Sequence, residues 1–79
     1  MMETELKDVN AVASLINGRY EIKLVDAPPA NLDAYAKVIE PIDKGRQLAL
    51  WVPEGTPGTA AQNMATHFVP QLRHMSDPA

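Results

Sequence analysis

The side chains that could carry chemistry are few in this sequence, and their spacing argues against catalysis. The two histidines, His67 and His74, would lie roughly 10 Å apart along one helix, too far for both to bind the same metal ion. Ser14 has no histidine near it in sequence that would act as a base, and Ser76 lies in the C-terminal tail, two residues after His74. We therefore expect no catalytic residue, no metal site and no cofactor, and a protein that is not an enzyme.

A glycine-containing loop at residues 54–59 has one feature of a phosphate-binding loop, because its glycines precede a predicted helix. It lacks the Gly-Lys-Ser/Thr ending of such loops and has no lysine nearby. Free amides at residues 58–60 would be able to hold an anion. The alternative, which the sequence favours, is that Pro57 and Thr59 simply begin and cap the helix.

Length and composition limit the kinds of function open to this chain. Its 79 residues make one small domain, 1–79, with a thin core, since a chain this short buries only roughly 60–65% of its unfolded surface. The net charge of −3 and the dispersed acids argue against direct nucleic-acid binding and against DNA mimicry. No apolar run approaches the ~20 residues of a membrane span, and the N-terminus is polar. The absence of cysteine fits a reducing compartment, so we expect a cytoplasmic protein.

The N-terminal half is predicted to contain a helix followed by a strand. Four apolar residues recur at helical spacing within residues 4–16: Leu6, Val9, Ala13 and Ile16. Asn17-Gly18 would end this helix, because both residues tolerate a left-handed backbone. Residues 19–25 then alternate as in a half-buried strand. One side of that strand carries Tyr20, Ile22 and Leu24.

Residues 32–42 are compatible with a short helix capped by Asn31 or with a strand, and we prefer the strand because β-branched residues are frequent in it. The following Asp-Lys-Gly sequence at 43–45 predicts a three-residue hairpin loop, which pairs Ile42 with Arg46. A loop one residue longer would change which residues of the second strand share each face.

A second helix is predicted from Thr59 onward. Its apolar stripe consists of Ala61, Met64, Ala65, Phe68, Leu72 and Met75. Pro70 removes a backbone donor, so we expect a kink or a break near Val69. The predicted fold is α+β, a three-stranded antiparallel sheet flanked by two helices in the order α-β-β-β-α. This order resembles the double-stranded-RNA-binding domain, but residues 59–64 lack the basic cluster that opens the second helix in that family.

The stretch from Tyr35 to Glu54, YAKVIEPIDKGRQLALWVPE, resembles the opening of HicB-type antitoxins. Those proteins also have a tyrosine-led strand, a Glu-Pro-rich turn and a strand that ends in proline, followed by a helix. The resemblance extends to Met75 and covers roughly half of the chain. It departs after Glu54 and lacks the C-terminal DNA-binding element that those antitoxins often carry. It implies a protein that binds and neutralises a small ribonuclease toxin.

In general character the chain resembles small phage-encoded anti-CRISPR inhibitors, because it is short, acidic, free of cysteine and without a catalytic motif. Size and elimination carry this resemblance, and no particular residues do. It implies a non-enzymatic inhibitor that binds a CRISPR effector complex and blocks target DNA binding or nuclease recruitment. This is the function that we expect; the HicB-like antitoxin is the alternative, and a small enzyme is a third class.

The predicted hairpin register suggests where a protein partner would bind. It places Trp51 opposite Lys37 and Ala49 opposite Ile39, on the reverse of the face that carries Leu48, Leu50 and Val52. If both helices pack on the leucine face, an exposed patch remains, and its predicted protein-binding residues are Trp51, Tyr35, Lys37 and Ile39. The alternative is that a helix crosses to this side and Trp51 belongs to the core. An open face and a free edge also predict either a homodimer or a fold that depends on its partner.

Overall fold

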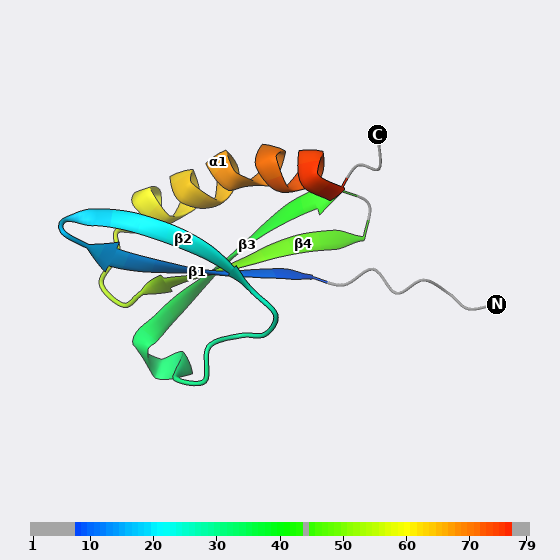
Figure 1. The fold of residues 1–79 in the computed structure, drawn as a ribbon. Coiled ribbons are helices and arrows are strands. Elements are labelled where there is room, and N and C mark those ends of the chain that lie inside the picture. Colours follow the sequence, from blue (N-terminus) through cyan, green and yellow to red (C-terminus); the bar gives the residue numbers. More distant parts are fainter. Residues whose placement is uncertain (1–7, 44, 77–79) are drawn as a thin grey trace.

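The computed structural model describes residues 8–43 and 45–76, which form a four-stranded sheet with one helix packed against it (Figure 1). The strands are β1 (Val9–Ile16), β2 (Arg19–Val25), β3 (Tyr35–Asp43) and β4 (Arg46–Pro53). A short 3-10 turn, η1 (Leu32–Ala34), precedes β3, and the helix is α1 (Gly58–Ser76). The strand order is β2-β1-β4-β3, in which β1 and β4 are parallel and the other neighbouring pairs are antiparallel.

The α+β class holds, but the predicted α-β-β-β-α order is wrong. Within the described residues the chain has one α-helix, at the C-terminal end, and a mixed sheet of four strands in place of a three-stranded antiparallel one. The order that carried the resemblance to the double-stranded-RNA-binding domain is therefore not the order of this fold.

The difference originates in residues 9–16, which form β1, whereas residues 4–7 of the predicted helix lie outside the described residues. β1 is an inner strand, paired with β2 on one side and with β4 on the other. A strand carries apolar residues on both faces where both faces of the sheet are covered. Ala11 and Ala13 are fully buried on one face of β1, and Val12 is half-buried on the other. Because apolar residues occupy both faces, their spacing coincides with that of a helix.

Asn17 and Gly18 close a hairpin where the sequence suggested the end of a helix. Their φ angles are 54° and 76°, the left-handed values that a two-residue type I′ turn requires. The strands on either side pair without irregularity from Ile16 opposite Arg19 to Asn10 opposite Val25. Asn17 and Gly18 thus adopt the left-handed backbone that the sequence predicted, but they form the turn between β1 and β2 and do not end a helix.

The second hairpin keeps most of its predicted register, and Trp51 lies opposite Lys37 as expected. The prediction fails beside the turn, where Asp43, in place of Ile42, lies opposite Arg46. A register irregularity just before Asp43 causes this change. The preceding segment combines both predicted alternatives, since η1 is a short helical turn and β3 is a strand.

The core lies between α1 and the face of the sheet that α1 covers, which we call the helix side. The helix runs over β3 and β4 (Figure 1). The sheet contributes Ala11, Ala13, Ile42, Leu48, Leu50 and Val52 to the buried cluster, and α1 contributes Ala61, Ala65, Val69 and Leu72. Met64 and Phe68 are partly buried against it, as the helical stripe predicted, while the side chain of Met75 lies outside the described part of the chain.

Helix α1 continues through Pro70, so of the predicted kink or break near Val69 the break does not occur. Proline removes the hydrogen bond that would reach the carbonyl of Thr66, and both of these residues are exposed. Water can therefore donate a hydrogen bond to that carbonyl. Val69 and Leu72 are buried on the opposite side of the helix, at 7% and 4% exposure, and hold both sides of the proline against the sheet.

The C-terminal part of α1 is also attached to the end of β3 by a polar contact. Arg73 donates hydrogen bonds from Nε and Nη2 to the carbonyl of Ile42, at 2.9 and 2.5 Å. The Ile42 side chain is fully buried in the core. The same short segment of β3 is thus held by the core through its side chain and by the helix through its backbone.

Candidate functional site

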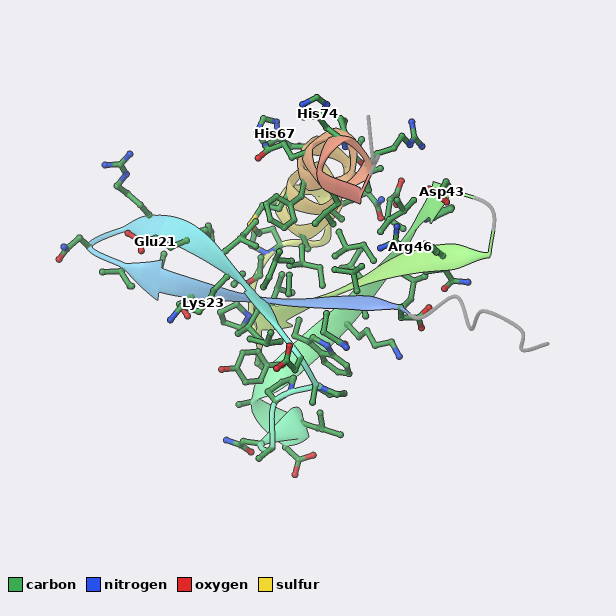
Figure 2. The ribbon with its side chains drawn as sticks, turned by 45° about the vertical axis from the view of Figure 1, so that its right-hand side comes forward. Glu21, Lys23, Asp43, Arg46, His67 and His74 are labelled. Carbon is green, nitrogen blue, oxygen red and sulfur yellow. The ribbon has the colours of Figure 1, made fainter. Side chains whose placement is uncertain are left out.

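The side chains considered for catalysis or metal binding remain apart. His67 and His74 are exposed on the side of α1 that faces away from the sheet (Figure 2). His67 Nε2 lies 3.3 Å from Nε2 of Gln71. Ser14 is exposed on β1, and the side chain of Ser76 lies outside the described residues. Within the described ranges, no three His, Cys, Asp or Glu side chains come close enough together to hold a metal ion.

The loop before α1 is organised by its own hydrogen bonds. The hydroxyl and the amide of Thr56 donate to the carbonyl of Pro53, at 2.7 and 3.0 Å. The amide of Ala61 donates to the carbonyl of Pro57 at 3.0 Å, and the helix begins at Gly58, one residue before the predicted Thr59. These contacts define the start of the helix directly after Pro57, and Thr59, which the sequence suggested as a cap, lies inside the first turn of α1.

Trp51 is buried although α1 covers the other side of the sheet. Its side chain is only 8% exposed. It lies on the face away from α1, which we call the far side, where the segment 26–34 also lies (Figures 1 and 2). The indole Nε1 donates a hydrogen bond to Oδ1 of Asn10 at 3.2 Å, and the Lys37 ammonium lies 5.2 Å from the centre of the indole ring.

The four predicted binding residues therefore differ in what they present to a partner. The structure brings Lys37 and Trp51 together, and it leaves Lys37 exposed while it buries Trp51. Ile39 is 42% exposed and Tyr35 is half-buried. Of the two alternatives for Trp51, burial is the one that is found, although α1 lies on the other side of the sheet. Ile39 and Lys37 are the members of this group that a partner would be able to contact.

A second surface, which the sequence interpretation missed, lies on the helix side of β1 and β2. Leu15 is 55% exposed, Tyr20 and Leu24 are each 38% exposed, and Ile22 is partly buried against the core. The β1–β2 register places all four side chains on one face, and we call them the β2 strip. The alternation in residues 19–25 identified this face. Only the position of α1 over β3 and β4 leaves it uncovered within the described structure.

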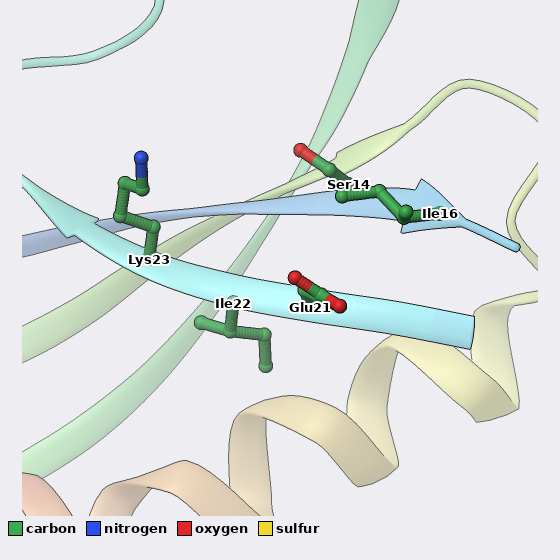
Figure 3. Close-up of a pocket in the computed structure, with 5 residues that line it drawn as sticks. All are labelled: Ser14, Ile16, Glu21, Ile22 and Lys23. Atoms are coloured by element: carbon green, nitrogen blue, oxygen red, sulfur yellow. The ribbon is translucent and has the colours of Figure 1, made fainter.

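Strand β2 also forms an edge of the sheet. A hollow of about 260 Å³ lies along it, lined by Ser14, Ile16, Glu21, Ile22 and Lys23 (Figure 3). Figure 3 shows Ile22 directed toward α1, whereas Glu21 and Lys23 project from the opposite face. Among the described residues, no side-chain hydrogen bond or ion pair engages either Glu21 or Lys23.

The opposite edge, β3, has a different character. It contains Pro41, which has no N–H to donate, and the irregularity before Asp43 interrupts its register. Proline and such irregularities are common ways in which edge strands resist pairing with another chain. Strand β2 has no proline, and its pairing with β1 is regular throughout. The β2 edge is therefore the one suited to further pairing.

The described part of the chain contains no helix that is both long and apolar enough to cross a membrane. The two features of the described structure that support a functional argument are the exposed apolar residues of the β2 strip and the regular β2 edge. In comparisons with known proteins, no family model, no curated protein and no solved structure matches this chain.

Proposed function

We propose that this protein is a non-enzymatic binding domain that inhibits a protein partner through the β2 strip. The observation that carries the proposal is the clustering of exposed apolar side chains. Six large apolar residues are exposed in the described structure, and three of them, Leu15, Tyr20 and Leu24, belong to this one strip. Exposed apolar residues scattered singly need no explanation, whereas a contiguous group on one face marks an interaction site.

Tyr20 is suited to the centre of such a surface. Its ring offers a large apolar area with few rotatable bonds, and tyrosine is among the residues that contribute most to protein interfaces. Leu15 lies directly opposite Tyr20 across the hairpin, so the two side chains are neighbours. The Tyr20 hydroxyl has only a long contact of 3.5 Å with Oγ1 of Thr56, which a partner group would be able to replace.

The narrower proposal is an inhibitor of the anti-CRISPR kind that acts in the cytoplasm on a CRISPR effector complex. Its support is the small, mildly acidic, cysteine-free chain together with the β2 strip. The second candidate is a HicB-like antitoxin. The observation in its favour is that β3, β4 and α1 follow one another as a hairpin and a helix over the segment that resembles those antitoxins.

A phage-plating experiment tests the proposal. The protein is expressed in bacteria whose CRISPR immunity blocks a phage, and the efficiency of plating is measured for several effector types. We expect the wild type to restore plating and Leu24→Asp to abolish the effect, because a buried carboxylate would disrupt an apolar contact. Leu32→Asp is the matched control, since Leu32 is 50% exposed on η1, outside the strip, and should leave inhibition intact.

Two outcomes would contradict the proposal. A wild type that restores plating against none of the effectors removes the anti-CRISPR assignment, and rescue of growth in cells expressing a small ribonuclease toxin would then support the antitoxin. Full inhibition by a folded Leu24→Asp variant would show that the β2 strip is not the binding surface. The melting temperatures of the two variants establish that both are folded.

A further inference from the structure

The turn that closes the first hairpin determines which backbone groups of β2 face outward. In a hairpin with a two-residue turn, the residues that flank the turn, here Ile16 and Arg19, form a hydrogen-bonded pair. Alternate residues of an antiparallel strand point their N–H and C=O groups in opposite directions. The odd-numbered residues of β2 therefore bond to β1. The groups that face the open edge belong to Tyr20, Ile22 and Leu24.

We propose that β2 pairs with β2 of a second copy of this chain, in the antiparallel direction, about a twofold axis at Ile22. In this arrangement Ile22 lies opposite Ile22 of the second copy, and Tyr20 lies opposite Leu24. Each of these is a hydrogen-bonded pair, in which the two residues exchange both of their N–H···O bonds. Every outward-facing backbone group named above then has a partner. The regular, proline-free β2 edge allows this pairing, and the β3 edge does not.

The charges on β2 select this register. Glu21 of one copy lies opposite Lys23 of the other, and the twofold symmetry produces the same pair again. Both are non-hydrogen-bonded pairs, in which side chains approach most closely and opposite charges are favourable. A shift of two residues one way would place Glu21 opposite Glu21 and Arg19 opposite Lys23. A shift of two the other way would place Lys23 opposite Lys23. Both shifts oppose like charges, and a shift of one residue would mix the two faces of the sheet.

The state of these charges in a single copy agrees with the proposal. Charged residues on an edge strand usually prevent association. Here the two charges are opposite in sign, project from the same face, and find no side-chain partner among the described residues of their own chain. They are therefore available to another chain, and they complement each other in this register. The register that would place Arg19 opposite Glu21 overlaps only residues 19–21 of the two strands and would leave most of the β2 edge unpaired.

Edge pairing would also enlarge the apolar surface. Because Ile22 faces Ile22, the helix sides of the two sheets become one continuous face, with the two α1 helices at its outer ends. The two β2 strips then adjoin across the twofold axis. This consequence rests on the proposed function, since a partner would contact a surface shared by both copies. The dimer itself is a property of the purified chain alone.

Charge reversal tests the dimer without an added partner. Sedimentation equilibrium of the purified chain is measured from about 1 µM to about 1 mM, a range of dissociation constants that small interfaces reach. We expect the wild type to dimerise. Glu21→Lys and Lys23→Glu should each raise the dissociation constant of the dimer roughly tenfold or more, because each variant places like charges opposite each other twice. Mixing these two variants should restore a heterodimer, and the double exchange Glu21→Lys/Lys23→Glu should restore a homodimer.

Matched controls separate a specific effect from a change in net charge. Asp43→Lys and Arg46→Glu make equivalent reversals at the β3–β4 turn, distant from β2 (Figure 2), and should leave the dimer unchanged.

Disulfide cross-linking tests the register of the dimer. The chain contains no cysteine, so introduced cysteines are the only thiols. An oxidised mixture of Glu21→Cys and Lys23→Cys should form a disulfide-linked heterodimer, whereas neither variant alone should cross-link.

Three results would overturn the dimer: a wild type that is monomeric throughout the range, a dimer that withstands both single reversals, or cross-linking of Glu21→Cys with itself. Melting temperatures of the charge variants close to that of the wild type exclude unfolding as the cause of dissociation. A monomeric protein that still inhibits phage immunity would overturn the dimer alone. A dimer without inhibitory activity would contradict only the proposed function.

Discussion

The indole Nε1 of Trp51 donates a hydrogen bond to Oδ1 of Asn10, at 3.2 Å, and thereby joins β4 to β1 through side chains as well as through the sheet. These two strands are parallel, and Asn10 lies opposite Ala49, two positions before Trp51. Trp51 is 8% exposed, so its N–H would have little access to water without this acceptor. The pair therefore stabilises a strand contact that is distant in sequence.

Removal of this acceptor should destabilise the fold. Asn10→Ala is expected to lower the free energy of unfolding by about 1 kcal/mol, because the buried indole N–H loses its partner. Urea denaturation measures the change. Asn63→Ala is the control, since Asn63 is exposed on α1, and its effect should stay within about 0.5 kcal/mol. Equal effects of the two substitutions would show that the Asn10 contact contributes nothing.

Trp51 should behave as a core residue. We expect blue-shifted fluorescence in the native protein and a loss of about 3–5 kcal/mol in unfolding free energy for Trp51→Ala, because a large buried ring leaves a cavity. Ile39→Ala, on the same far side but 42% exposed, should cost less than about 1 kcal/mol. Native emission at the wavelength of a solvated indole would contradict the burial of Trp51.

Two glycines should respond in opposite ways to alanine. Gly18 has a φ of +76°, so Gly18→Ala should lower the unfolding free energy by about 1–2 kcal/mol, although a Cβ atom would meet no heavy atom within 4 Å. Gly58 begins α1 without a positive φ and has the same open surroundings. Gly58→Ala should therefore raise stability by about 0.4–1 kcal/mol. Thermal unfolding of both variants measures the pair, and changes of the same sign would contradict the assigned turn.

The contact of α1 with the sheet depends on a small side chain. Ala65 is fully buried in the core cluster, so Ala65→Leu should cost about 1–3 kcal/mol through overcrowding. Thr66→Leu provides the control on the next residue, which is exposed, and should change stability by less than about 0.5 kcal/mol. Chemical denaturation compares them. Tolerance of leucine at Ala65 would mean that α1 lies farther from the sheet than the structure places it.

Local patterns were sufficient to predict several elements. The alternation in residues 19–25 predicted β2, and the spacing of apolar residues after Thr59 predicted the buried side of α1. The β3–β4 hairpin kept its predicted register from Tyr35 to Pro41, although the pairing beside the turn differs by one residue. In each of these cases the partners that form the element are close together in the sequence.

What the sequence by itself determined was therefore the local geometry, including the left-handed backbone at Asn17 and Gly18. The tertiary structure decided that residues 9–16 form a strand, because their backbone pairs with β2 on one side and with β4 on the other, and β4 is distant in the sequence. It also decided that Trp51 is buried and that the β2 strip is exposed, since the position of α1 and the parallel β1–β4 pairing join segments far apart in the chain. Contacts of this kind depend on which completed faces pack together, and no short stretch of sequence contains that information.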